Sequence, residues 1–204
     1  KAPSFNDLYY PGFSNPALQP ETARNAEAGI YWTAAAGSVR WEARAIGYRN
    51  RVDDLIVFQC DADYNCLPRN VDRATLSGVT LGVDAAWRDT RVKGSLDLQE
   101  PEDDATGALL PRRARRHGVL TVLQQAGPVQ VGAEFVASSL RYDDLANTRK
   151  MGGYGIVNVT LDWPFASGWV LSVRGNNVLD KDYQLAADYA TGGANVFATI
   201  RWQP

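Results

Sequence analysis

Hydrophobic and polar residues alternate along most of this chain. In GVTLGVDAAW, the side chains of Val79, Leu81 and Val83 fall on one face of an extended strand, and those of Thr80 and Asp84 fall on the other. VQVGAEFVA and WVLSVRGN repeat this arrangement, and helical periodicity is weak throughout. A period of two predicts strands, and a polar residue on the second face of almost every strand indicates that this face meets water.

Nine segments carry the alternation, so the sequence predicts an antiparallel all-β fold. They lie near residues 23–34, 38–50, 72–87, 91–100, 115–126, 128–139, 152–163, 168–177 and 194–203. The connections between them alternate in length. Short turns are expected near residues 35–37, 88–90, 127–128 and 164–167, and long connections at 51–71, 101–114, 140–151 and 178–193.

A soluble β-sandwich also alternates, with its apolar face turned inward. Two features favour a transmembrane β-barrel instead. The segments are 10 to 16 residues long, whereas strands in globular proteins are mostly about 5 to 6 residues and those of membrane barrels about 9 to 11. Connections that alternate between short and long are typical of outer-membrane barrels, which have tight turns in the periplasm and long loops outside.

The tryptophans give a third reason. All six fall at strand ends on the short-turn side or at the end of the chain, each in phase with the apolar face of its strand: Trp32, Trp41, Trp87, Trp163, Trp169 and Trp202. Amphipathic rings prefer the level of the lipid headgroups, so a row of tryptophans at one height predicts an aromatic girdle.

Composition narrows the picture further. With 21 basic and 23 acidic residues the net charge is −2, which provides no global basic field for nucleic acid, and we expect no nucleic-acid partner. The chain begins without Met and without the pattern of a signal peptide. Nine strands leave two open edges, which are costly in lipid, so we expect a fragment whose remaining barrel strands come from missing N-terminal sequence.

Two cysteines lie close together in CDADYNC, a polar, turn-rich stretch. Their proximity predicts a disulfide between Cys60 and Cys66, formed in an oxidising compartment. Half of a metal site is the alternative, but two thiols do not complete the usual four ligands of zinc, and His117 is the only histidine. Tyr64, between the cysteines, is a candidate ligand contact on a stapled loop.

The stretch NNVLDKDY resembles the penultimate-strand motif of TonB-dependent outer-membrane receptors, usually N-L-F-D-K-x-Y, with Leu179 where Phe is common. KAPSFNDLYY, NPALQPE, YRNRVDDLI and GALLPRRARR resemble other stretches of that family in the same order and spacing, so the resemblance covers nearly the whole chain. KMGGY before a strand, and the tyrosine-containing loop after DKDY, are most similar to the cobalamin receptor branch. The end of the chain departs from the pattern: such barrels usually finish on an aromatic residue, whereas this one continues from Trp202 to Gln203 and Pro204.

The resemblance implies that residues 1–204 form about nine C-terminal strands of a 22-stranded barrel, a size associated with a plugged lumen. It also implies a plug domain and a TonB-binding box in the missing N-terminal part, and a place in the outer membrane of a Gram-negative cell among lipid and lipopolysaccharide, with the long loops extracellular and the C-terminus periplasmic. The implied ligand is cobalamin or a related corrinoid. A ferric siderophore or haem receptor of the same fold is one alternative, and a plug-less porin or adhesin-type export barrel is another.

Ligand capture in that family occurs at the extracellular loops and the plug, so exposed aromatic and basic loop residues are the candidates. Tyr189, in ADYATGG, is expected either to pack on a flat ligand or simply to pack locally. Arg112 and Arg113 are expected at the mouth of the lumen, where they contact ligand amides, meet lipopolysaccharide phosphates or keep the edge solvated. The acidic run Glu100, Glu102, Asp103 and Asp104 is interpreted as a solvated loop rather than a cation site. No catalytic constellation is predicted, so we expect a transporter without a cofactor rather than an enzyme.

Overall fold

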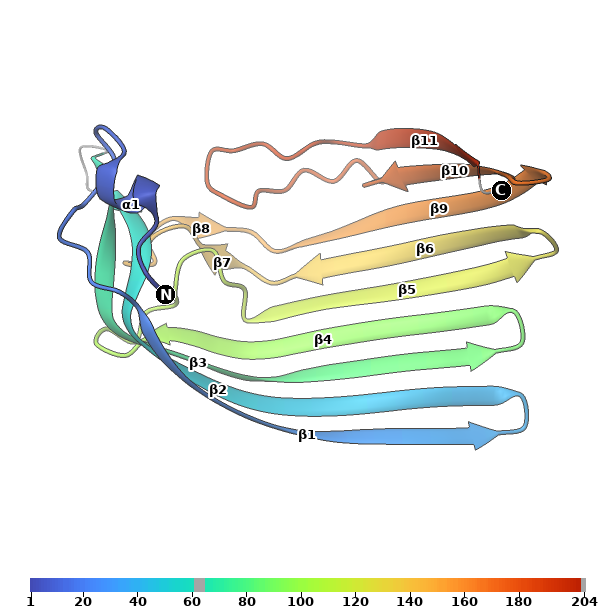
Figure 1. The fold of residues 1–204 in the computed structure, drawn as a ribbon, viewed down its shortest axis with the longest axis horizontal. Helices are drawn as coiled ribbons and strands as arrows, with labels where there is room; N and C mark the ends of the chain where they lie inside the picture. Colours follow the sequence, from blue (N-terminus) through green and yellow to red (C-terminus); the bar gives the residue numbers. More distant parts are fainter. Residues whose placement is uncertain (61–64, 203–204) are drawn as a thin grey trace.

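The computed structural model describes residues 1–60 and 65–202. Nine long strands form one antiparallel sheet, and their order in the sheet follows their order in the chain (Figure 1). The strands are β1 (Thr22–Ala36), β2 (Val39–Cys60), β3 (Cys66–Trp87), β4 (Thr90–Asp103), β5 (Arg116–Ala126), β6 (Val129–Ser138), β9 (Tyr154–Ala166), β10 (Trp169–Asn176) and β11 (Asn195–Trp202). The predicted all-β fold and its nine principal strands are confirmed.

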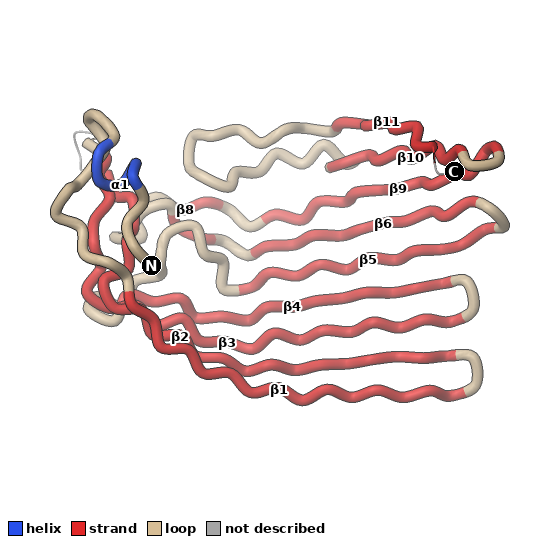
Figure 2. The backbone as a smooth tube through the Cα atoms, viewed as in Figure 1, coloured by secondary structure: helices blue, strands red, loops and turns tan. Residues whose placement is uncertain are grey.

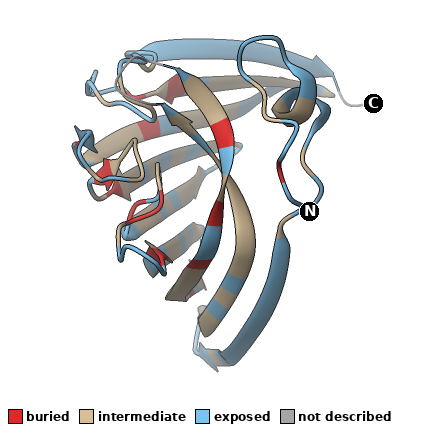
Figure 3. Ribbon diagram, turned by 90° about the vertical axis from the view of Figure 1, so that its left-hand side faces the viewer, coloured by how far each residue is buried: buried red, intermediate tan, exposed pale blue. Residues whose placement is uncertain are grey.

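The connections divide between the two ends of the sheet. Two-residue turns link β1 to β2, β3 to β4, β5 to β6 and β9 to β10 at one end, and the longer connections lie at the other (Figure 2). We call these the short-turn end and the long-connection end. Seen from the long-connection end, the sheet curves into an open trough, which is part of an incomplete barrel (Figure 3).

The strand register confirms which residues share a face. Leu81 pairs with Ala45 on one side and Leu96 on the other, and Leu120 pairs with Phe135. These side chains lie on the convex, outer face, and the apolar ones stay accessible: Leu81 is 39% exposed and Phe135 47%. An apolar face left open to this extent is what a lipid-facing surface requires.

All six tryptophans belong to this outer face and lie toward the short-turn end, as predicted. The rings of Trp32 and Trp41 are 5.3 Å apart between centroids, and Trp169 is directly opposite Trp202 in the register of β10 and β11. The tryptophans therefore form a girdle near the short-turn end of the three first and the three last strands of the sheet, whereas β4, β5 and β6 carry none.

The predicted long connection at residues 51–71 is wrong. Most of it continues the β2 and β3 ladder, which stays in register from Val39 opposite Trp87 to Cys60 opposite Cys66. This part of the ladder contains residues that are depleted in strands, namely consecutive aspartates at 53 and 54 and a proline at 68. Asp54 accommodates its place with a positive φ of 57°, and the carbonyl of Pro68, which has no N–H to give to the ladder, accepts a hydrogen bond from the side chain of Asn15.

We call the part of the ladder formed by residues 51–60 of β2 and residues 66–71 of β3 the extended hairpin. The N-terminal residues 1–21 pack along it. They include a short helix that the sequence reading missed, α1 (Phe5–Tyr9), with a capping box between Ser4 and Asp7. The amide of Asn70 donates to the carbonyl of Gln19, and its oxygen accepts from the Gln19 N–H. Within the described residues, no helix is long and apolar enough to cross a membrane.

The buried apolar residues are concentrated at the long-connection end. The best shielded of them come from residues 1–21, from the part of β3 near the long-connection end and from the connections, rather than from the middle of the sheet. They are Leu18, Val71, Ala74, Leu109, Leu110, Ala114 and Met151. Two short strands, β7 (Arg141–Tyr142) and β8 (Lys150–Met151), pair within one of these connections. We call the exposed apolar side chains of the outer face the apolar band. The protein therefore has a small water-shielded core outside this band, at the long-connection end.

Candidate functional site

Three long connections meet beside the extended hairpin, and we call them the loop cluster. They are residues 104–115 between β4 and β5, residues 139–153 between β6 and β9, and residues 177–194 between β10 and β11. All three emerge at the long-connection end (Figure 1). Binding residues are found disproportionately on loops held by a rigid scaffold, so this end is the candidate site.

The middle connection is tied to the first by side-chain and backbone bonds. The guanidinium of Arg112 donates to the carboxylate of Asp143 at 2.7 Å, and the Arg112 N–H donates to the carbonyl of Tyr142 at 2.6 Å. Asn147 makes a two-way bond with Leu109, in which its amide nitrogen donates to the Leu109 carbonyl and its oxygen accepts from the Leu109 N–H. These bonds fix the position of one connection against the other.

Asp144 organises the turn within the middle connection. Its carboxylate accepts hydrogen bonds from the N–H groups of Thr148 and Arg149 and from the Thr148 hydroxyl. Partial burial works to raise the pKa of Asp144, but these hydrogen bonds to the charged form outweigh it and hold the pKa below its ordinary value. The turn is therefore stabilised by an ionised carboxylate.

The NNVLDKDY stretch begins the last connection, and its polar residues have structural roles. Asn177 has a φ of 47° and is buried, and its side chain bonds both the N–H and the carbonyl of Lys181. Its own N–H donates to the side chain of Asn158 in β9, and Asp180 accepts from the N–H of Ala194 at the far end of the connection. The motif therefore closes the chain into a fixed turn.

Arg141 is the best-buried charged side chain among the described residues, at 4% exposure. It donates to the hydroxyl of Ser138 and to the backbone carbonyl of Gln184, and its guanidinium lies 5.2 Å from the ring centroid of Tyr154. The Tyr154 ring in turn packs against Tyr183 at 4.4 Å. Arg141 thus joins the middle connection to the last one.

A second, exposed bond joins the same two connections, between Arg149 and Asp188. Asp188 precedes Tyr189, whose side chain is 73% exposed. The predicted candidate Tyr189 therefore projects from a connection that is held at Gln184 and again at the adjacent residue.

A cavity of about 400 Å³ lies between the hairpin and the loop cluster. Phe58 and Gln59 of β2 line one side, and Arg112, Thr148 and Arg149 line the other. Arg113 lines a smaller neighbouring cavity with Leu55 and Leu110. The structure thus brings Arg112 and Arg113 together beside the hairpin, whereas Tyr189 is not among the residues that line either cavity.

The remaining sequence predictions divide as follows. The disulfide between Cys60 and Cys66 is present and closes the hairpin. Tyr64 lies outside the described residues. The acidic run is only partly a loop: Glu100, Glu102 and Asp103 belong to β4, whereas Asp104 begins the connection that follows it. Asp103 is buried and accepts hydrogen bonds from Ala105 and Thr106. In the part of the chain that the structure describes, no three His, Cys, Asp or Glu residues form a group suited to a metal ion.

Sequence reasoning missed Arg141, Asn147 and the pair of Arg149 with Asp188. The signal for Arg141 was a lone cation shortly after the alternating strand that ends at Ser138, with Ser139 and Leu140 between them. Its burial depends on Tyr154 and Gln184, which are distant in sequence, so spacing alone did not reveal it.

Comparison with known proteins agrees with this architecture. The family model described as TonB dependent receptor-like, beta-barrel matches residues 1–178. The vitamin B12 transporter BtuB of Photobacterium profundum is 30% identical over 209 residues, and that of Vibrio vulnificus is 29% identical over 212. Each alignment covers 100% of this chain but only 34% and 33% of the respective relative, so the chain spans about one third of their length.

Solved structures show the same fold. The copper transporter OprC superposes with a TM-score of 0.76 at 17% identity, covering 99% of this chain and 35% of that one. The siderophore receptor PiuA from Acinetobacter baumannii gives a TM-score of 0.70 at 20% identity, covering 88% and 28%. With the family match over most of its length, an exposed apolar outer face and connections sorted by length, the chain belongs to the TonB-dependent receptor family, whose members are outer-membrane β-barrels of Gram-negative bacteria.

Proposed function

We propose that the receptor containing this chain imports cobalamin or a related corrinoid across the outer membrane, energised through TonB. The long-connection end then faces the outside of the cell and captures the ligand, and the short-turn end and C-terminus face the periplasm. A plug domain and the other barrel strands, supplied by the rest of the receptor, complete the transport path.

One observation carries the ligand assignment. The similarity to the two vitamin B12 transporters extends over all of this chain, including the long connections, where the family's members are expected to differ most with ligand. The solved structures, at 20% identity or less, support the fold and do not bear on the ligand.

The chemistry of the loop cluster suits a large ligand with flat apolar surface and polar amides. Tyr189 offers an exposed ring for contact area at low conformational cost. Arg112 offers further N–H donors to ligand carbonyls while its Nε remains paired with Asp143. Because the connections are joined to one another, these groups are positioned before a ligand arrives, which reduces the entropy lost on binding.

Equilibrium binding of labelled cobalamin to the complete receptor tests the proposal. Tyr189→Ala and Arg112→Ala should each weaken binding by about 1 to 2 kcal/mol, the size of a significant interface contact. Matched controls exist at the opposite end: Tyr31, which is 64% exposed in β1, and Arg88, which also has a positive φ, at 52° against 61° for Arg112. Tyr31→Ala and Arg88→Ala should leave cobalamin affinity unchanged.

Two outcomes would count against the proposal in different ways. If the parent receptor does not bind cobalamin but binds a ferric siderophore or haem, the ligand assignment is wrong and the iron receptor takes its place. If the parent binds cobalamin and both loop variants match the controls, the ligand stands but Tyr189 and Arg112 do not contribute. The family match makes a plugged receptor a better expectation than a plug-less porin or adhesin-type barrel.

A further inference from the structure

The outer face changes character abruptly toward the long-connection end. Gly47, Val79 and Leu98 lie opposite one another on β2, β3 and β4 and form the last apolar row. Two residues further along β2 on the same face lies Arg49, opposite Ser77, and Arg51 follows opposite Thr75. The step from an apolar row to arginines marks the boundary where lipid chains give way to headgroups.

A third arginine joins them from the neighbouring strand. Arg24 of β1 is directly opposite Arg51 in the register, and Arg49 is two residues from Arg51 on the same face. All three side chains are exposed. Two like charges directly opposite each other in adjacent strands are destabilising unless something supplies negative charge between them.

The described part of the chain does not supply that charge. None of the three arginines forms an ion pair there, and the nearest outward carboxylate, Asp53, is bonded to Arg73 at 2.9 Å. Glu100 and Glu102 are in the same rows but two strands away, on β4, where both face Arg115 at 3.8 Å and 3.4 Å. Two strand spacings are about 10 Å, which is about one Debye length at moderate salt, so these carboxylates offset the arginines only weakly.

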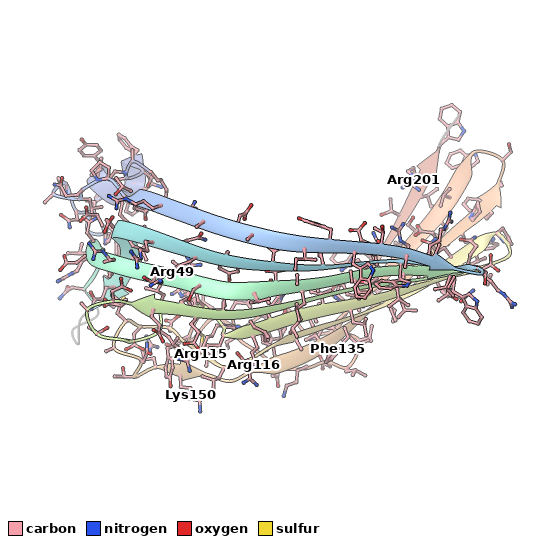
Figure 4. All side chains as sticks on the ribbon, turned by 90° about the horizontal axis from the view of Figure 1, so that it is seen from below. Arg49, Arg115, Arg116, Phe135, Lys150 and Arg201 are labelled. Atoms are coloured by element: carbon pink, nitrogen blue, oxygen red, sulfur yellow. A yellow bond between two sulfur atoms is a disulfide. The ribbon has the colours of Figure 1, made fainter. Side chains whose placement is uncertain are left out.

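We propose that Arg24, Arg49 and Arg51 form a binding site for the phosphate groups of anionic lipid in the leaflet next to the long connections. The site has the sign, the depth and the geometry that such a headgroup needs. Guanidinium groups bind phosphate oxygens in a bidentate manner, and Ser77, beside Arg49, adds a hydroxyl. Figure 4 shows Arg49 toward the long-connection end of the sheet, beyond Phe135 of the apolar band. Arg116 of β5, opposite Leu98, is a further outward arginine at the same boundary, but Glu100 and Glu102 of β4 separate it from the three.

Lipid binding to the complete receptor in a neutral detergent, measured by native mass spectrometry, tests this site. The probe is lipid A, a phosphorylated glycolipid, and phosphatidylcholine serves as the zwitterionic reference. Replacing Arg24, Arg49 and Arg51 by Gln should weaken lipid A binding by about fivefold for each arginine removed and leave phosphatidylcholine binding unchanged. A triple variant with the same loss of charge on the inner face, Arg40→Gln, Arg44→Gln and Arg201→Gln, should bind lipid A as the parent does.

A competition experiment distinguishes a lipid headgroup from a free anion. Inorganic phosphate at the concentration of the lipid should not displace lipid A, because the acyl chains hold the headgroup at the boundary. Displacement at equal concentration would overturn the lipid assignment in favour of a site for soluble anions. Equal lipid A binding by the parent and the outer triple variant would overturn the site itself.

Thermal unfolding gives a second, independent result. In phosphatidylcholine alone, the outer triple variant should be at least as stable as the parent, because the opposed charges of Arg24 and Arg51 are gone. Adding lipid A should raise the melting temperature of the parent and of the inner control more than that of the outer variant. An equal rise in all three would contradict the proposal.

Discussion

The apolar band and the long-connection end are built by opposite rules. On the band, apolar side chains such as Val83 remain 40% exposed and the structure relies on lipid to cover them. At the long-connection end, apolar residues such as Leu110 are 1% exposed and polar side chains are bonded to one another. One chain therefore folds against two solvents, with a core only where it projects into water.

The largest effect that would test this contrast is a charge placed on the band. Leu81→Arg, near its middle, should destabilise the complete receptor by about 2 to 4 kcal/mol, because the charge must leave water. Thr80→Arg is the control: Thr80 faces the inner side, where its hydroxyl bonds Asp97 at 2.7 Å. Unfolding titrations in lipid should show a much smaller loss for Thr80→Arg, and equal losses would refute the facing of β3.

The long-connection end should instead be sensitive to loss of a buried donor. Arg141→Met keeps most of the apolar volume but leaves the Gln184 carbonyl without its donor, at a cost of about 1.5 to 3 kcal/mol. Hydrogen exchange in the complete receptor should show faster exchange across residues 177–194, with the strand amides unchanged.

The matched control is the exposed bond between the same connections. Arg149→Met breaks the pair with Asp188, whose carboxylate is 79% exposed, and exposed pairs contribute about 0 to 1 kcal/mol. If both substitutions accelerate exchange equally, burial is not what makes Arg141 important.

Reduction of the disulfide should have a local effect. In the chain-entropy treatment, a disulfide that closes a loop with a sequence separation of 6 lowers the conformational entropy of the unfolded chain. This stabilises the folded hairpin tip by about 2 kcal/mol. Because Gln59 and Leu67 remain paired in the ladder, the extended hairpin should fray at its tip and the band should stay folded. Exchange of the hairpin amides with and without reductant measures this, and unfolding of the sheet on reduction would contradict it.

The smallest expected effect concerns acid. The pKa of Asp144 is lowered in the folded protein, so the stability that its ionised form gives to residues 143–149 is complete above the ordinary aspartate pKa. It is lost as the pH falls through the lowered folded value. The protection of this turn against hydrogen exchange, taken relative to the intrinsic exchange rate at each pH, should fall in that acidic range in the parent and be independent of pH there in Asp144→Asn. A pH response of the protection in the variant would assign it to another group.

The facing of the apolar band was predictable from the sequence because one local pattern, the alternation of apolar and polar residues, determines it. Alternation with period two specifies which side chains meet lipid. A row such as Val79, Leu81 and Val83 allows only one orientation of the strand, with these three side chains toward lipid. The phase of the tryptophans located the short-turn end by the same reasoning. These local patterns needed no knowledge of the neighbouring strands.

The long-connection end was less readable because its structure depends on contacts between distant residues. The sequence pattern predicts a loop where the extended hairpin lies, since Asn15, Asn70 and Gln19 stabilise the hairpin from outside the β2 and β3 ladder. The role of Arg141 depends on its hydrogen bond to the backbone carbonyl of Gln184, which is 43 residues away in the sequence. Cys60 and Cys66 were the exception, because a disulfide between near neighbours is a local feature.

The order of the sheet has a consequence for how this part of the barrel assembles. In the part of the chain that the structure describes, each of the nine strands pairs with the strands next to it in chain order, so each can add to this sheet without a partner that is distant in sequence. Only short loops must close at each step, which keeps the entropic barrier of each addition low. The strands are therefore suited to joining the sheet one hairpin at a time, in chain order. The bond from Arg141 to the Gln184 carbonyl skips one hairpin, so it can form only after β10 is in place.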